Sequence, residues 1–248
     1  MNKKISIGLI SLTACEGCYF SILEELEKFL ALNSKIEIKN FRLMEEDPHF
    51  EPEKFDIVFI EGSPLTEKNM EQLKALRKNS KIVIAAGSCA QLGGIYHLKN
   101  YQDKEKLFDY IYCGVEGIEN FDVLPIAKVI PVDFNLPGCP VTAREFFAFV
   151  YSLMINKKPK IAQRPVCYEC QINGYECVLQ KGEKCLGPIT FAGCDAICLK
   201  SKQGCWGCRG FLPDAEADNL IKKLKEKFTE KEIVQLLEVF GVKESLQK

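Results

Sequence analysis

The sequence has no excess of charge of either sign and no long apolar run. Its 33 lysine and arginine residues nearly balance 34 aspartate and glutamate residues, which leaves a formal net charge of −1. Such a chain lacks the electrostatic signature of binding to nucleic acid or to an acidic membrane. No apolar stretch approaches the roughly 20 residues of a membrane-spanning helix. Internal repeats and low-complexity segments are also missing. We therefore expect neither nucleic-acid binding nor a membrane span.

Cysteine, in contrast, is abundant: the chain has 13. An odd total with CxxC pairs is unlike the even-numbered frameworks of short secreted proteins that depend on disulfides. Glycines and prolines, rather than apolar runs, separate the cysteines of residues 167–208. Such a segment buries too little apolar surface to fold by itself, so we expect disulfides, zinc or iron–sulfur clusters to crosslink it. Its eight cysteines are Cys167, Cys170, Cys177, Cys185, Cys194, Cys198, Cys205 and Cys208.

The first 14 residues resemble an export signal, because two lysines precede an apolar stretch that ends before Cys15. The stretch is shorter than the roughly 15–30 residues of a signal peptide, and serine and glycine interrupt it. We therefore predict a first strand there.

Strands alternate with helices in the amino-terminal part. The hydrophobic pattern predicts strands at 5–12, 36–41, 55–60, 81–86 and 127–132, and helices at 19–32, 66–78 and 141–155. The helix at 19–32 places Phe20, Leu23, Leu26, Phe29 and Leu30 at helical spacing. Alternation of this kind is typical of an α/β fold with a parallel sheet covered on both faces.

A polar stretch at 156–164 indicates a domain boundary, so we predict domains at 1–158 and 159–248. After the cysteine-rich segment, residues 214–228 are amphipathic. Thr229 and Glu232 then form a capping-box pattern that opens a last helix through Phe240, which Gly241 ends.

Four other cysteines each follow the carboxyl end of a predicted strand. They are Cys15, Cys18, Cys89 and Cys139. The carboxyl ends of parallel strands share one edge of the sheet, where ligands normally bind, so these thiols are expected to converge. The neighbouring Gly17, Gly87 and Gly138 suit tight turns whose backbone N–H groups can point at sulfur.

Together these twelve cysteines make three sets of four, with Cys113 left over. Four thiolates suit either tetrahedral zinc or a 4Fe–4S cluster. A zinc ribbon pairs two CxxC units across roughly 15–20 residues. Here Cys167/Cys170 and Cys205/Cys208 lie further apart, with four single cysteines between them. This spacing favours iron–sulfur clusters, with a zinc-stapled interaction module as the alternative.

The motifs also resemble a known family. They are Cys15-Glu16-Gly17-Cys18, Glu61-Gly62-Ser63, Gly87-Ser88-Cys89-Ala90, Pro137-Gly138-Cys139-Pro140, Cys185-Leu186-Gly187-Pro188-Ile189-Thr190 and Cys205-Trp206-Gly207-Cys208. In this order they resemble the small, electron-transferring subunit of nickel–iron hydrogenases, along essentially the whole chain. The greatest resemblance is to the cytoplasmic group called sulfhydrogenase or soluble NAD(P)-linked hydrogenase, delta subunit.

The resemblance implies an oxidoreductase subunit acting on hydrogen, with a flavodoxin-like domain followed by a small loop-rich iron–sulfur domain and C-terminal helices. It implies three 4Fe–4S clusters, the proximal one on Cys15, Cys18, Cys89 and Cys139. The distal cluster would be held by Cys167, Cys170, Cys177 and Cys185, and the medial one by Cys194, Cys198, Cys205 and Cys208. The nickel–iron centre would belong to a large subunit, so no catalytic residue and no nickel are expected here. A flavin/NAD(P)-binding diaphorase subunit and an iron–sulfur subunit are the other expected partners.

Two departures from the periplasmic members concern the ligands. Those proteins have a distal histidine where this chain has Cys167, and they lack the medial thiol that Cys198 supplies. The histidines here are His49 and His97, both in the first domain. Thiolates in place of histidine lower cluster potentials, which suits a low-potential acceptor such as a nicotinamide. The absence of a twin-arginine leader agrees with a cytoplasmic location. A relative in the complex I lineage, which keeps only the proximal type of cluster, is disfavoured by the eight later cysteines.

The remaining motif residues have less definite roles. Trp206 and Phe191 either shield the medial cluster or simply pack in the core. Glu16 is expected to be a solvated surface residue, the alternative being a contact with the large subunit. Glu61 faces the proximal site by resemblance alone. Cys113 is expected to be a buried, inert thiol.

Overall fold

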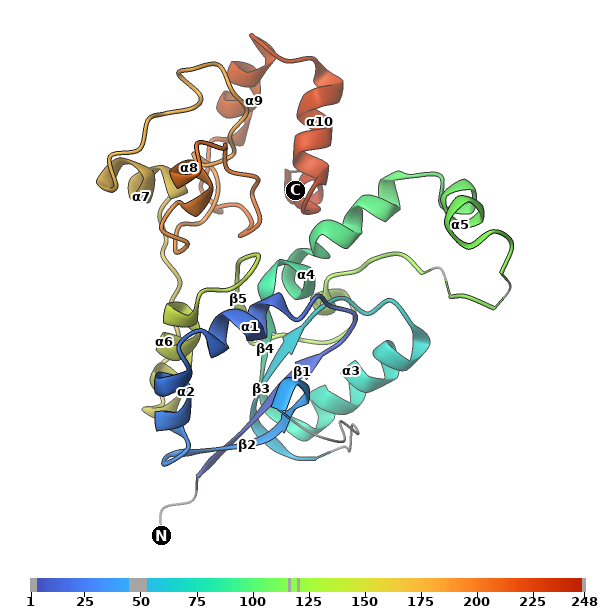
Figure 1. The fold of residues 1–248 in the computed structure, drawn as a ribbon, viewed down its shortest axis with the longest axis vertical. Helices are drawn as coiled ribbons and strands as arrows, with labels where there is room; N and C mark the ends of the chain where they lie inside the picture. The colour runs from blue at the N-terminus through green and yellow to red at the C-terminus, as the bar shows by residue number, and fades with distance from the viewer. Residues whose placement is uncertain (1–3, 45–52, 116, 120, 247–248) are drawn as a thin grey trace.

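The computed structural model of the 248-residue chain describes residues 4–44, 53–115, 117–119 and 121–246. Figure 1 shows two parts along the long axis of the molecule. The strands and their helices form one part, and a loop-rich region with short helices forms the other.

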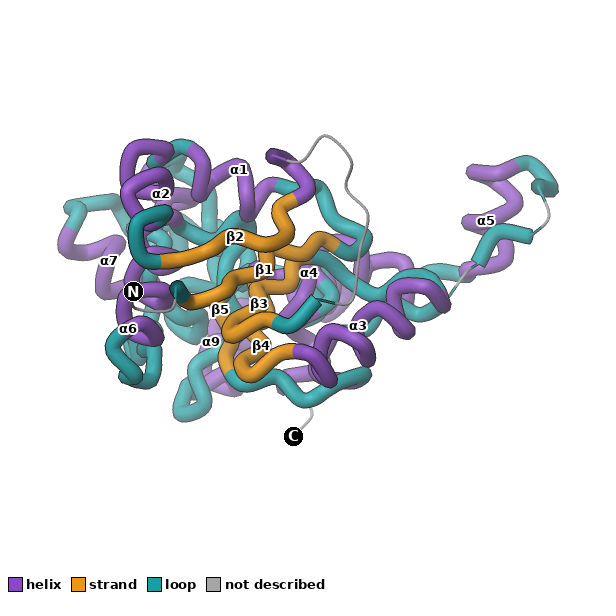
Figure 2. The backbone as a smooth tube through the Cα atoms, turned by 90° about the horizontal axis from the view of Figure 1, so that it is seen from below, coloured by secondary structure: helices purple, strands orange, loops and turns teal. Residues whose placement is uncertain are grey.

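Five parallel strands form the sheet, in the order β2-β1-β3-β4-β5 (Figure 2). The strands are β1 (Ile5–Ser11), β2 (Ile36–Phe41), β3 (Phe55–Glu61), β4 (Ser80–Ala86) and β5 (Phe134–Leu136). Leu9 pairs with Phe59, and Ile60 pairs with Ala85. This strand order is the flavodoxin-like one, in which ligands bind at the carboxyl ends of the strands. The predicted α/β fold with a parallel sheet is therefore confirmed.

Helices cover both faces of the sheet. Ile57 and Phe59 belong to a core with α1 (Gly17–Leu23), α2 (Leu26–Leu32) and α6 (Ala143–Met154). Val58 and Ile60 point the other way, into a core with α3 (Glu67–Asn79) and α4 (Gly87–Leu92). Successive side chains of a strand alternate between faces. Because both faces are buried, β3 reads as a nearly continuous apolar run.

Threonine caps fix where two of these helices begin. The Thr66 hydroxyl accepts a hydrogen bond from the Asn69 backbone N–H at 3.1 Å, and Thr142 accepts one from Glu145 at 3.3 Å. A side-chain oxygen at this position satisfies a backbone donor that has no partner within the helix. The predicted helices at 66–78 and 141–155 are confirmed to within two residues.

The single helix predicted at 19–32 is wrong. The chain forms two helices, α1 and α2, which Glu24 and Glu25 separate. The backbone leaves the helical conformation at Glu25. The break changes which side chains face the sheet, because the core side of α1 is set by Tyr19, whose hydroxyl lies 2.9 Å from the Phe59 carbonyl. The predicted stripe is therefore partly exposed: Phe20, Leu26 and Leu30 are 58%, 47% and 47% exposed.

The strand predicted at 127–132 is also wrong. Residues Ile126–Lys128 form a short 3-10 helix, and the fifth strand begins later, at Phe134. Ile126 and Ile130 insert into the apolar core from irregular backbone, which gives a strand-like pattern without strand pairing. Asp133 then fixes the chain beside β4, because its backbone N–H donates to the Val83 carbonyl at 2.9 Å.

Three helices between β4 and residue 115 escaped prediction, and α4 is the first of them. The 3-10 helix η2 (Gly94–Tyr101), which buries His97, leads into α5 (Lys104–Tyr112), and α5 stands away from the body of the molecule (Figures 1 and 2). No residue of α5 is buried, and Tyr110 is 85% exposed. We call residues 102–115 the arm. Cys113 ends α5 and is exposed, so the prediction of a buried thiol is wrong.

The second part holds α7 (Val166–Ile172), α8 (Ile197–Lys200), α9 (Ala217–Lys225) and α10 (Glu230–Glu238), and it ends in a short 3-10 helix at Val242–Leu246. Another short 3-10 helix, at Arg42–Met44, belongs to the first part. Leu220, Leu224 and Leu237 form a small core of the last helices. The capping box of Thr229 and Glu232 is present as predicted. None of the described helices is long and apolar enough to cross a membrane.

Candidate metal centres

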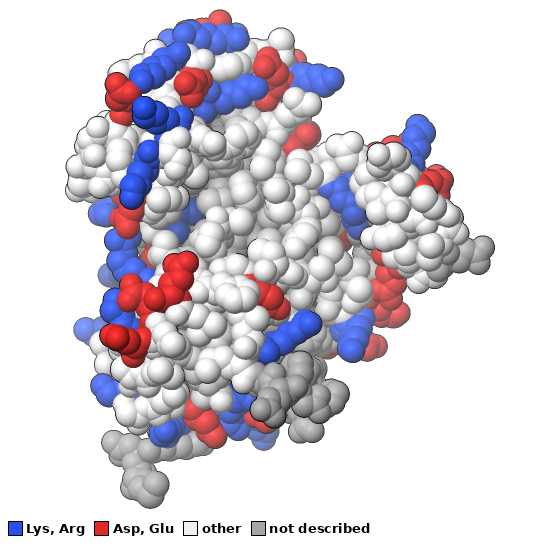
Figure 3. All heavy atoms as spheres, viewed as in Figure 1, with Lys and Arg blue, Asp and Glu red and all other residues white. Residues whose placement is uncertain are grey.

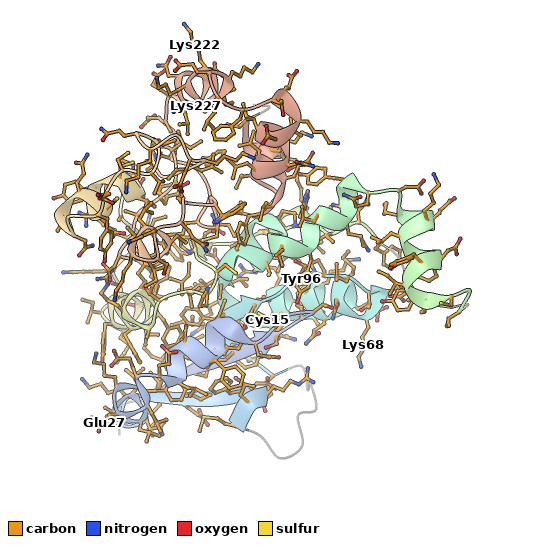
Figure 4. The ribbon with its side chains drawn as sticks, turned by 45° about the horizontal axis from the view of Figure 1, so that its top comes forward. Cys15, Glu27, Lys68, Tyr96, Lys222 and Lys227 are labelled. Carbon is orange, nitrogen blue, oxygen red and sulfur yellow. The ribbon has the colours of Figure 1, made fainter. Side chains whose placement is uncertain are left out.

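The four cysteines that follow strands lie together at the carboxyl edge of the sheet. Cys15 lies between β1 and α1, Cys18 is in the first turn of α1, Cys89 is in α4, and Cys139 follows β5. Cys89 is close enough to Cys139 and Cys15 for their charges to act on it, and Cys18 is similarly close to Cys89. Tyr96 lies beside this group and next to Cys15 in Figure 4. The structure thus brings together the four thiols that the sequence pattern predicts to converge.

Glycines leave room around these sulfur atoms. A Cβ atom at Gly87 would lie 2.5 Å from the Cys18 sulfur, and one at Gly94 would lie 2.5 Å from the Cys89 sulfur. Both glycines have positive φ, 84° and 61°, which side chains rarely tolerate. Larger residues at either position would displace a thiol.

Burial makes the thiols of Cys18, Cys89 and Cys139 hard to ionise. It raises the pKa of Cys89 to about 12, and the neighbouring Cys139 and Cys15 add to the shift. Burial likewise raises the pKa of Cys18 and Cys139. Four thiolates crowded at one edge of the sheet need positive charge to replace their protons, and metal binding supplies it. The donor set therefore fits a 4Fe–4S cluster, which takes four thiolates.

Two acidic residues flank the sheet-edge thiols. Glu61, at the end of β3, is 2% exposed, and its Oε1 accepts a hydrogen bond from the Cys18 backbone N–H at 3.1 Å. Its Oε2 has no partner among the described residues. Glu16 is half-buried and accepts a hydrogen bond from the Ser11 hydroxyl at 2.5 Å, so the expectation of a solvated surface glutamate is wrong. Glu61 touches a thiol-bearing residue, as the resemblance suggested.

A second set of thiols lines one apolar pocket. Cys167, Cys170, Cys177 and Cys185 line a small pocket together with Val166, Val178, Leu179, Gly187 and Leu199. Burial raises the pKa of Cys167 to about 12, and the charge of Cys185 adds to it. The Cys185 sulfur accepts hydrogen bonds from the backbone N–H of Gly187 at 3.4 Å and of Cys205 at 3.2 Å. Backbone donors of this kind stabilise charge on sulfur.

The third set lines the groove between the two parts of the molecule. Cys194, Cys198, Cys205 and Cys208 border it together with Cys139 and Trp206. Trp206 is 42% exposed, and Phe191 does not border the groove. Burial raises the pKa of Cys208 to about 12, although a hydrogen bond from the Cys139 backbone opposes the shift. Trp206 is thus in a position to shield this set, whereas Phe191 is not.

The three sets are contiguous. Cys139 of the sheet edge contacts Cys208 of the groove through its backbone. Cys205 of the groove contacts the Cys185 sulfur of the apolar pocket at 3.2 Å. The order in space is therefore sheet edge, groove, pocket, although the pocket set precedes the groove set in the sequence.

Several other residues complete the description of these sites. His97 is buried against Tyr101, with ring centroids 5.2 Å apart, and His49 lies outside the described residues. Among residues 4–44, 53–115, 117–119 and 121–246, no three His, Cys, Asp or Glu side chains form a group that could hold a single metal ion. Sequence reasoning missed Tyr96 and the buried Arg209, because no motif marks either one.

Comparison with known protein families matches the first part of the chain. Residues 15–153 match the family described as NADH ubiquinone oxidoreductase, 20 Kd subunit. That range contains the four sheet-edge cysteines and ends before the eight later ones.

One relative extends the match to nearly the whole chain. The delta subunit of sulfhydrogenase 2 from Pyrococcus furiosus is 32% identical over 239 residues, which cover 96% of this chain and 99% of the relative.

Two solved structures are similar as well. An NAD+-reducing NiFe-hydrogenase in the H2-reduced state matches with a TM-score of 0.58 and 28% identity, over 64% of this chain and 95% of its own. An actinobacterial-type NiFe-hydrogenase from Ralstonia eutropha H16 matches in fold, with a TM-score of 0.60 and 18% identity, over 99% of this chain and 92% of its own. The chain therefore belongs to the NADH ubiquinone oxidoreductase 20 Kd subunit family and, within it, to the electron-transferring small subunits of nickel–iron hydrogenases.

Proposed function

We propose that this chain relays electrons through three 4Fe–4S clusters, from the hydrogen-activating site of a large subunit to a low-potential acceptor. The contiguity of the three thiol sets supports this most strongly. The backbone of Cys139 joins the sheet edge to the groove, and Cys205 joins the groove to the pocket. The sheet edge would hold the proximal cluster, the groove the medial one and the pocket the distal one. The flavodoxin-like domain, 1–158, would carry the first, and residues 159–248 the other two.

The protein's part in this relay is to hold, desolvate and electrostatically tune the sites. When bound, each cluster takes up and releases single electrons. Buried apolar side chains such as Val178 and Leu199 keep water from the distal pocket. Backbone N–H groups directed at sulfur, as at Cys185, stabilise negative charge there and help to set the potential.

All-cysteine ligation favours an acceptor of low potential. Cys167 lines the distal pocket at the position where periplasmic members have histidine, and Cys198 borders the medial groove. Both thiolates add negative charge, which lowers the potential of a cluster. We therefore expect a flavin/NAD(P)-binding subunit, with an accompanying iron–sulfur subunit, as the receiving partner in the cytoplasm. The similarity to an NAD+-reducing hydrogenase agrees with that assignment.

The large subunit is expected to cover the face that surrounds the sheet-edge thiols. The face in Figure 3 has a broad uncharged middle, bordered by charged residues at the end that carries α9 and along both sides. Ile95, next to Tyr96, is 51% exposed, and Tyr110 and Ile111 of the arm are 85% and 55% exposed. Exposed apolar and aromatic residues in such numbers mark protein–protein interfaces.

Anaerobic purification with metal analysis tests the proposal. Three 4Fe–4S clusters predict about twelve iron atoms per chain and a brown absorbance. Stoichiometric zinc in a colourless protein would support the zinc-stapled module instead. About four irons per chain would leave only the sheet-edge site, as in a relative of the complex I lineage.

A further inference from the structure

Arg209 is a fully buried cation at the boundary between the two parts of the chain. Its exposed fraction is 0%, and its guanidinium donates hydrogen bonds in three directions. Nε donates to the carbonyls of Phe191 and Ala192, both at 3.0 Å, and Nη1 donates to the Pro137 carbonyl at 2.8 Å. Nη2 forms an ion pair with Glu145 Oε1 at 2.7 Å. A planar fork with five donors is the one side chain that can satisfy all of these acceptors.

These contacts place the charge between two thiol sets. Pro137 precedes the loop that presents Cys139, and Ala192 precedes the segment that presents Cys194. Arg209 itself directly follows Cys208, whose sulfur receives a hydrogen bond from the Cys139 backbone. The packing is close: a Cβ atom at Gly193 would lie 2.3 Å from both Arg209 Nη2 and Glu145 Oε1.

A contribution to folding stability does not by itself explain the buried ion pair of Arg209 and Glu145. Desolvating two charges costs much of what their attraction returns, and well-packed apolar residues often replace buried ion pairs without loss. A buried charge, however, acts strongly on neighbouring charges because water does not screen it. The pair therefore has an electrostatic reach that an apolar replacement would lack.

We infer that Arg209 and Glu145 form a positioning and charge-tuning pair that holds the Cys139 and Cys194 loops together and sets the potential of the medial cluster. This inference rests on the proposed function. Reduction adds one negative charge to a cluster. The positive charge of Arg209 favours the reduced form, and the negative charge of Glu145 opposes it.

Redox titration of the hydrogenase complex, monitored by electron paramagnetic resonance, tests the inference. Three single variants are compared with wild type: Arg209→Gln, Glu145→Gln and Arg144→Gln. Arg144 is the matched control, because it lies beside Glu145 and also contacts the Cys194 segment, through the Gly193 carbonyl, but is 60% exposed and pairs with the exposed Asp195. The medial signal is the one that changes when Cys198 is replaced by alanine. Iron content is measured for every sample.

We expect the two buried variants to shift the medial potential in opposite directions. Arg209→Gln should lower the medial potential and Glu145→Gln should raise it, while Arg144→Gln leaves it unchanged because water screens the exposed charge. If Arg209→Gln fails to assemble, Glu145→Gln still decides: a raised potential supports the inference and an unchanged one overturns it. Shifts of the same sign in both buried variants would also overturn it, since they would indicate a general distortion of the loops.

Failure of the inference can be told apart from failure of the proposed function. A wild-type complex with about twelve irons per chain, and no shift in either buried variant, refutes the role of the pair alone. A wild-type chain without iron refutes the proposed function and the inference with it.

Discussion

Glu61 accepts a hydrogen bond from the backbone N–H of Cys18 at 3.1 Å, although the two residues are 43 positions apart in the sequence. Cys18 lies in the first turn of α1, where backbone donors have no partner within the helix. Glu16, which precedes this helix, makes no side-chain capping bond. A carboxylate from β3 therefore takes the place of a local cap, and it ties a thiol-bearing turn to the sheet.

Two replacements of Glu61 should distinguish the effect of this hydrogen bond on stability from the effect of the carboxylate's charge. Glu61→Ala leaves the buried Cys18 N–H without an acceptor and should lower the free energy of unfolding by about 1–3 kcal/mol. Glu61→Gln keeps an oxygen acceptor and should lose much less. Denaturant unfolding under anaerobic conditions measures both. Equal losses in the two variants would contradict the capping role.

Replacement of the leftover cysteine should not affect the metal sites. Cys113 is exposed at the end of α5, on the arm, away from the three thiol sets. We expect Cys113→Ser to keep the full iron content and an unchanged paramagnetic spectrum. Iron analysis checks this, and loss of about four irons would mean that a different set of twelve cysteines holds the clusters.

Replacement of Cys198 should affect one site only. Cys198 borders the groove together with Cys194, Cys205 and Cys208. Without its thiolate, the medial site should hold a three-iron cluster of higher potential, because one negative ligand is gone. Electron paramagnetic resonance of Cys198→Ala should show the new signal while the other two clusters keep theirs. A spectrum identical to that of wild type would remove Cys198 from the ligand set.

Asp56 should make stability depend on pH below the neutral range. The Lys81 ammonium at 2.7 Å, with help from Ser6, lowers the pKa of Asp56 from 3.8 to about 2. A carboxyl group with a depressed pKa stabilises the fold above its unfolded pKa and loses that contribution as pH falls. Compared with Asp56→Asn, wild type should be more stable by about 1–2 kcal/mol at pH 6, with the difference disappearing between pH 4 and pH 2. A difference that is constant over this range would contradict the ion pair's role.

Asp133 should be important for seating the last strand. Its Oδ2 accepts hydrogen bonds from the Val83 backbone at 2.7 Å and from Arg77 at 2.6 Å, just before β5 begins. Asp133→Ala should lower the free energy of unfolding by about 1–3 kcal/mol, since the Val83 N–H loses its partner. Hydrogen exchange at Phe134–Leu136 should speed up in the variant. Unchanged exchange there would show that β5 is held by its own pairing with β4 alone.

Local patterns predicted the sheet well and failed where tertiary contacts overrule them. Residues 55–60 carry apolar side chains for both faces of the sheet, a pattern that a buried strand satisfies. Residues 127–132 carry a similar pattern, yet Ile126 and Ile130 reach the core from irregular backbone, and Asp133 decides where pairing starts. The exposed positions of Phe20 and Leu26 likewise follow from the break between α1 and α2, which no residue in the sequence marks.

The sequence by itself determined that twelve thiols fall into a sheet-edge set and a cysteine-rich segment, because strand ends and CxxC spacing are properties of neighbouring residues. Only the tertiary structure decided how those sets touch. A hydrogen bond from the Cys205 backbone N–H to the Cys185 sulfur joins two separate loops of the cysteine-rich segment. The hydrogen bond from the buried Arg209 to the Pro137 carbonyl joins residues that are far apart along the chain. Such contacts depend on how whole segments of the chain pack together, and packing at that range leaves no periodic trace in the sequence.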